Sequence, residues 1–144
     1  MKLTTKTLAM SLIFVAGIAV AKEGVKDPGV KLRMDTMDTM AMNMKLMANM
    51  AAGKMDFNAA DAATAKANVL AAVKKIPDVF KGHDMDPATD ALPVIWTSWD
   101  DFVKKAGDAR MAVELIDTDT QDQMKTSLTE VGKACGVCHK AYRS

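Results

Sequence analysis

The sequence of 144 residues is short of several residue types on which common functions depend. It contains two cysteines, two histidines and one tyrosine, and aromatic residues make up only 5% of the chain. No group of residues suited to general acid–base or nucleophilic catalysis stands out, so we do not expect an enzyme. Basic and acidic residues number 19 and 18, a balance that argues against a nucleic-acid partner.

Alternation of β-branched and polar residues, which is the pattern of a half-buried strand, is also rare in the chain. Helix-forming residues are abundant instead, among them many alanines and 13 methionines. The length leaves room for one domain. We therefore predict an all-α protein with a single domain.

Residues 1–21 have the layout of a secretory signal peptide. Two lysines precede an uncharged apolar run over residues 8–20, and residues 19–21 read Ala-Val-Ala, which fits a cleavage site. An uncleaved membrane anchor is the alternative, but the run is short for a membrane span. We predict a signal peptide at 1–21, a mature domain at 22–144, and no stable membrane anchor in the processed protein.

The spacing of apolar residues predicts four helices in the mature chain. In the first helix, methionines recur at steps of three and four residues, which is the spacing of a bundle helix. These are Met37, Met40, Met44 and Met47, and we interpret them as core packing. The predicted helices cover residues 30–52, 59–75 and 93–116, followed by the segment from a break at 117–119 to the end of the chain. Helices of this length and connection predict an antiparallel four-helix bundle.

The strongest functional signal lies in the last ten residues. Cys135, Cys138 and His139 form the pattern C-x-x-C-H, which is the attachment signature of a c-type haem. Two thiols on one helical turn can each add to a vinyl group of the porphyrin. His139 can then bind the iron as the axial ligand. The motif predicts one covalent haem c near the C-terminus.

Three other interpretations of the two cysteines are a disulfide, a thioredoxin-like redox centre and a zinc site. A thioredoxin-like centre needs a βαβ setting, and no strand pattern precedes the motif. A structural zinc site needs four ligands, and the only other histidine, His83, lies in a predicted loop at 81–90. Covalent haem attachment takes place after translocation in bacteria, which agrees with the signal peptide. We therefore predict a periplasmic haem protein.

Residues 131–143 resemble the last helix of the cytochrome c′ family, including the Tyr142-Arg143 pair after the motif. Arg33 followed by Met37 resembles the first-helix pattern of the same family. The resemblance implies a four-helix bundle in which Arg33 neighbours a haem propionate and Met37 faces the distal side of the iron. It also implies that Arg143 is a cofactor-binding residue.

Two branches of this bundle family differ at the distal face of the iron. In cytochrome c′ proper an apolar residue covers that face and the iron stays five-coordinate. In low-spin relatives a methionine at the same place binds the iron as a sixth ligand. Met37 suits either role. The Arg33-to-Met37 spacing and the Tyr142-Arg143 ending are similar to cytochrome c′ proper, which favours a residue that only blocks the distal site.

The resemblance implies a periplasmic cytochrome that transfers single electrons through its haem, with redox partner proteins of unknown identity. The alternative is a five-coordinate haem protein that binds nitric oxide or carbon monoxide behind an apolar distal gate. In either case small gaseous ligands can reach the iron if the distal site is open. The resemblance also implies a homodimer built on the first two helices.

Overall fold

A computed structural model describes residues 24–144 of the chain. The signal peptide predicted at residues 1–21 lies outside the described residues. Within residues 24–144, no helix is both long and apolar enough to cross a membrane.

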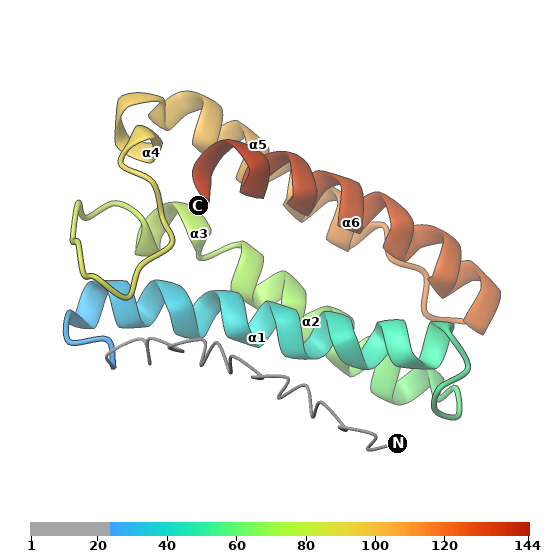
Figure 1. The fold of residues 1–144 in the computed structure, drawn as a ribbon. Helices are drawn as coiled ribbons and strands as arrows, with labels where there is room; N and C mark the ends of the chain where they lie inside the picture. Colours follow the sequence, from blue (N-terminus) through green and yellow to red (C-terminus); the bar gives the residue numbers. More distant parts are fainter. Residues whose placement is uncertain (1–23) are drawn as a thin grey trace, which may run out of the picture.

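Four long helices run back and forth along one axis, and two short helices lie at one end of them (Figure 1). α1 packs mainly on α2, and α5 packs mainly on α6. The bounds are α1 Pro28–Ala51, α2 Ala59–Val73, α3 Ile76–Val79, α4 Val94–Thr97, α5 Trp99–Glu114 and α6 Gln121–Tyr142. The predicted antiparallel four-helix bundle is confirmed.

Local capping explains where the first two helices begin and end. Asp27 caps α1 by accepting a hydrogen bond from the Val30 amide at 2.8 Å, and Pro28 occupies the first turn. The helix therefore begins two residues before the predicted start. Gly53, with φ 66°, adopts the left-handed conformation just after the helix, and Asn58 caps α2 through the Ala60 and Asp61 amides.

The predicted third helix, residues 93–116, is not continuous. It is divided into α4 and α5 at Ser98, whose backbone leaves the helical region with φ −124° and ψ 41°. The break lets both neighbouring tryptophans pack inward. Trp96 donates its indole N–H to the Phe80 carbonyl at 2.8 Å, while Trp99 stacks on Phe102 with ring centroids 5.5 Å apart. The predicted second helix, residues 59–75, likewise ends early at Val73, and Pro77 then lies in the first turn of the separate α3.

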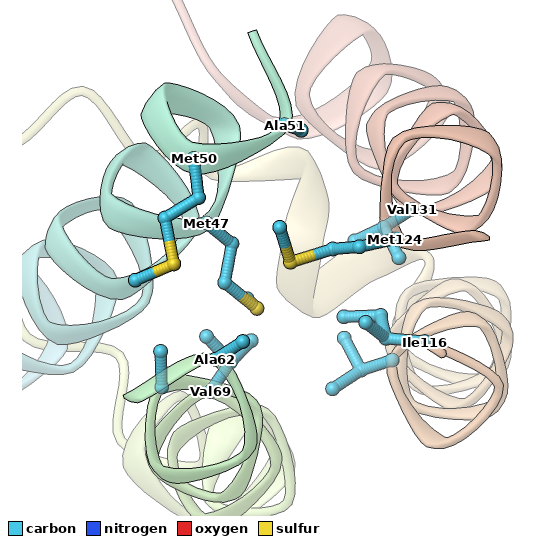
Figure 2. Packing of buried hydrophobic residues seen from close by; sticks show 10 residues of the cluster. Met47, Met50, Ala51, Ala62, Val69, Ile116, Met124 and Val131 are labelled. Carbon is cyan, nitrogen blue, oxygen red and sulfur yellow. The ribbon is translucent and has the colours of Figure 1, made fainter. Parts of the chain in front are cut away.

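The core consists of two clusters along the bundle. The methionine cluster lies toward the α1–α2 turn, where Met47 from α1 and Met124 from α6 both point into the space between the helices (Figure 2). Its buried members are Met47, Met50, Ala51, Ala62, Ala65, Val69, Val113, Ile116, Met124 and Val131. The aromatic cluster lies toward α3 and α4. Its buried members are Val73, Ile76, Phe80, Ile95, Phe102, Ala106, Ala109 and Tyr142.

Met47 gives the clearest test of this packing. It is fully buried, so Met47→Ala removes apolar contacts and leaves a cavity. We expect the free energy of unfolding to fall by about 2–5 kcal/mol in urea titrations. Met42→Ala is the control, because Met42 lies on the same helix with 65% of its surface exposed and should change stability by less than about 0.5 kcal/mol. Equal losses of stability in the two variants would contradict the placement of Met47 in the core.

Candidate haem site

Helix α6 carries the C-x-x-C-H motif in its last two turns, and its end is fixed to the segment before α4. Thr120 caps the start of the helix by accepting from the Gln123 amide. At the other end, the Tyr142 carbonyl accepts from the Leu92 amide at 3.0 Å, and the Ser144 amide donates to the Asp90 carbonyl at 2.9 Å. The motif therefore lies on a helix that is capped at its start and hydrogen-bonded at its end to the segment before α4.

The two cysteines face the interior from the same turn of α6. Cys135 packs against the methionine cluster and Cys138 against the aromatic cluster, so the thiols lie where the two clusters meet. Both thiols are half-buried and free, with no disulfide between them. Burial raises the pKa of each thiol, and the neighbouring Cys135 adds to the effect on Cys138. A thioredoxin-like nucleophile needs the opposite, a lowered pKa.

His139 follows on the outer side of the motif and is exposed in this structure. The protein around this exposed side chain still removes part of its solvent, which lowers the pKa of the imidazole, and the positive charge of Arg143 adds to this effect. The neutral imidazole is the form that binds a metal. Arg143 itself caps α6 and pairs with Asp90 at 3.3 Å, so the structure brings it to the His139 side of the site.

Arg33 is buried in α1, with 2% of its surface exposed, and holds the segment that follows α3. Its guanidinium donates to the carbonyls of Val79, Gly82 and Asp84 at 3.0, 2.5 and 2.8 Å, and to the Asp84 carboxylate at 2.9 Å. It also lies 5.3 Å from the ring centroid of Phe80 and the same distance from that of Trp96. Four of its five N–H donors are used in this way. Its role at a haem propionate stays a prediction.

Met37 lies one turn after Arg33 and is half-buried against the aromatic cluster. Cys138 packs against the same cluster from α6. The structure therefore brings Met37 and Cys138 to one apolar region from two different helices. The position of Met37 on the distal side and its contact with iron both stay predictions.

Sequence reasoning missed three polar contacts at the end of α6. The Tyr142 hydroxyl donates to the Asp101 carboxylate at 2.5 Å, and Lys105 binds the same carboxylate. Ser98 accepts more weakly from this hydroxyl through its carbonyl, at 3.4 Å. Asp101 and Lys105 are four residues apart on α5, which is a recognisable helix pair. Their position beside the motif depends on tertiary packing and has no local signal.

This contact predicts the titration of Tyr142, the only tyrosine in the chain. The hydrogen bond to Asp101, together with burial, raises the pKa of Tyr142 to about 12. Because the folded pKa lies above the usual value of about 10, the contact stabilises the fold fully below about pH 10 and is lost as the pH rises toward 12. We expect tyrosinate absorbance with a midpoint near 12. Asp101→Asn should lower the midpoint toward 10, and Asp108→Asn should not.

The donors present fit a covalent haem c. Two free thiols on one turn are directed into apolar packing, and an imidazole is supplied by the next residue. Gly132 lies seven residues before His139 on the same face, and a Cβ added there would meet no protein atom within 4 Å. Within residues 24–144, no group of three or more His, Cys, Asp or Glu side chains is arranged to hold a metal ion by itself.

Comparisons with known proteins agree with this assignment. The family model described as Cytochrome C' matches residues 29–143. Cytochrome c-556 of Agrobacterium fabrum is 32% identical over 148 residues, covering 99% of this chain and 97% of the relative. Cytochrome c-554 of Cereibacter sphaeroides is 31% identical and covers 94% of each chain. Cytochrome c' of Halomonas halodenitrificans is 29% identical, covering 82% of this chain and 97% of the relative.

Solved structures show the same fold. Cytochrome c' from Rubrivivax gelatinosus aligns with a TM-score of 0.73 at 29% identity, covering 81% of this chain and 94% of that chain. Cytochrome c prime from Shewanella frigidimarina aligns with a TM-score of 0.69 at 26% identity, over 81% and 94% of the two chains. With its four-helix bundle and its pair of inward-facing thiols, the chain belongs to the cytochrome c′ family and is a haem protein with covalently bound haem c.

Proposed function

We propose that the protein is a periplasmic carrier of single electrons, with haem attached through Cys135 and Cys138 and His139 as the proximal iron ligand. The observation that carries the proposal is the position of the motif turn, residues 135–139 of α6, between the core and the solvent. The two thiols are half-buried inside, whereas Val137, between them, has 58% of its surface exposed, and Lys140 is also exposed. A redox group attached here lies close to the surface where a partner protein can dock.

The surrounding residues provide what a one-electron carrier needs. Haem iron held by cysteine thioethers and histidine accepts and releases one electron without changing its covalent links to the protein. The methionine and aromatic clusters exclude water from the inner side of the site, which lowers the local dielectric constant. The cap at the start of α6 and the hydrogen bonds at its end keep His139 in place. A rigid site needs little rearrangement between two oxidation states, which favours fast electron exchange.

A periplasmic location follows from the predicted signal peptide and from the need to attach haem after export. Redox partner proteins would meet the exposed face of the motif turn. A homodimer through α1 and α2 stays a prediction from the family resemblance. Size-exclusion chromatography with light scattering on the mature haem protein measures this state directly.

A redox titration combined with partner kinetics tests the electron-transfer proposal. We expect reversible oxidation and reduction with a single one-electron step. The reduced protein should pass its electron to a soluble c-type cytochrome at a rate that rises with partner concentration. Added carbon monoxide should leave that rate largely unchanged during the mixing time. A reduced protein that fails to reduce the partner in the absence of carbon monoxide would contradict the proposal.

One observation favours gas binding as the second candidate. Met37 lies in apolar surroundings formed by the aromatic cluster, with Phe80 and Tyr142 among its buried members. An apolar distal site suits nitric oxide or carbon monoxide, which need no charged partner. Electron transfer does not require a sixth ligand, whereas gas binding requires an open coordination position, so a six-coordinate iron would favour electron transfer. Absorption spectra of the parent protein with and without carbon monoxide show how the iron is coordinated.

A further inference from the structure

Helix α5 presents a charged pair to the end of α6. The Lys105 ammonium binds the two Asp101 carboxylate oxygens at 2.6 and 2.5 Å, and the same carboxylate accepts from the Tyr142 hydroxyl at 2.5 Å. The Lys105 ammonium also lies 6.0 Å from the centroid of the Tyr142 ring. These contacts fix the pair in one position, because the carboxylate is bound from two helices.

This pair lies beside one of the haem-binding thiols. Tyr142 follows Cys138 by four residues, so their side chains share one face of α6, and both pack with the aromatic cluster. The Tyr142 hydroxyl, which donates to Asp101, therefore places the carboxylate and its Lys105 partner on the side of the aromatic cluster against which Cys138 packs. The side chain of Lys105 is only 22% exposed, so solvent screens its charge less than that of a free surface lysine.

A second pair on the same helix provides a natural comparison. Lys104 and Asp108 also form an i,i+4 ion pair, with an N–O distance of 2.8 Å. The Lys104 side chain is 70% exposed, and within residues 24–144 the pair forms its ion pair on α5 without a hydrogen bond or ion pair to α6. The two pairs therefore carry the same charges on the same helix, but only one of them contacts the helix that bears the cysteines.

We propose that Lys105 and Asp101 are positioning residues that shift the reduction potential of the haem in opposite directions, with the Tyr142 hydroxyl holding the carboxylate in place beside Cys138. The proposal rests on the haem attachment at Cys138 given under the proposed function. Reduction adds one electron to the site, so a nearby positive charge favours the reduced state and a nearby negative charge favours the oxidised state. In the parent protein the two charges largely cancel. Removing either one leaves the other uncompensated.

Potentiometric titration of the holoprotein variants tests the charge pair. Lys105→Met keeps the apolar stem and removes the positive charge, so the potential should fall. Asp101→Asn keeps the shape of the side chain and removes the negative charge, so the potential should rise. We expect each change to alter the one-electron equilibrium about threefold to tenfold, or about 30–60 mV. The double variant should return close to the parent value.

Three controls separate charge from structure. Lys104→Met and Asp108→Asn should each change the equilibrium less than about twofold. Lys105→Arg keeps the charge and should keep the parent potential. Shifts of equal size from the Lys104–Asp108 pair, or shifts of the same sign from Lys105→Met and Asp101→Asn, would overturn the proposal. A shift in Lys105→Arg as large as that in Lys105→Met would overturn it as well.

The same samples show whether a failure lies in the attachment or in the charge pair. One aliquot of each variant is extracted with acidified organic solvent, and a separate aliquot is titrated. If the haem stays with the polypeptide and the potentials of all variants are unchanged, the proposed effect of the charge pair is wrong but the covalent attachment stands. Haem that leaves the parent polypeptide contradicts the attachment at Cys138 and overturns this inference with it.

Discussion

The double variant Cys135→Ala, Cys138→Ala should release all of its haem into acidified organic solvent, whereas the parent protein should release none. The chain has only these two cysteines, so the variant has no thiol left to form a thioether. Both thiols are free and face the core from one turn of α6, which leaves them available to the same macrocycle. In the parent protein both should be consumed, so the denatured holoprotein should show no reactive thiol.

Val137→Ala is the matched control for this experiment. It changes the residue between the two cysteines, which is 58% exposed, and leaves both thiols in place. Its haem should stay covalently bound. Extraction of haem from the parent protein, or full retention in the double variant, would show that the haem is held in some other way. The single variants Cys135→Ala and Cys138→Ala should each retain haem through the remaining thioether.

Most of the fold could be predicted from the sequence because its signals are local. Asn58 and Gly53 mark helix ends by their own conformational and hydrogen-bonding preferences, and they lie directly beside the predicted ranges 59–75 and 30–52. The break at Ser98 could not be predicted from the periodicity around it. It depends on contacts of Trp96 with Phe80 and of Ser98 with Tyr142, partners 16 and 44 residues away in the chain.

In the candidate site, too, local features could be predicted from the sequence and long-range contacts could not. The C-x-x-C-H motif is local chemistry, since one helical turn supplies both thiols and the imidazole. Arg33 shows the limit of pattern reasoning. Its neighbours in the sequence reveal nothing of the carbonyls of Val79, Gly82 and Asp84, which lie 46–51 residues away and occupy most of its donors. The family resemblance identified Arg33 as important. Its partners became visible only in the folded structure.

Met37→Ala should leave the iron high-spin and accelerate carbon monoxide binding about tenfold or more. Met37 lies in the aromatic region that also receives Cys138, one turn after the fixed Arg33, so its side chain can cover the distal face. If it only blocks that face, the parent iron is already five-coordinate and high-spin. Truncation then removes an obstacle without changing the ligand set. A barrier lower by about 1.4 kcal/mol gives the tenfold increase in rate.

Stability cannot distinguish this blocking role from iron ligation, because a half-buried methionine loses packing in either case. Met47→Ala is therefore the appropriate control: it removes the same side chain from the same helix, at a buried position in the methionine cluster. It should lower stability and leave both the spin state and the rate of carbon monoxide binding close to those of the parent.

Spin state, read from absorption spectra, separates the blocking role of Met37 from iron ligation. A parent protein that is low-spin and becomes high-spin in Met37→Ala, with a lower potential and new carbon monoxide binding, would show that the Met37 thioether is the sixth ligand. The closed distal site would then favour electron transfer over gas binding.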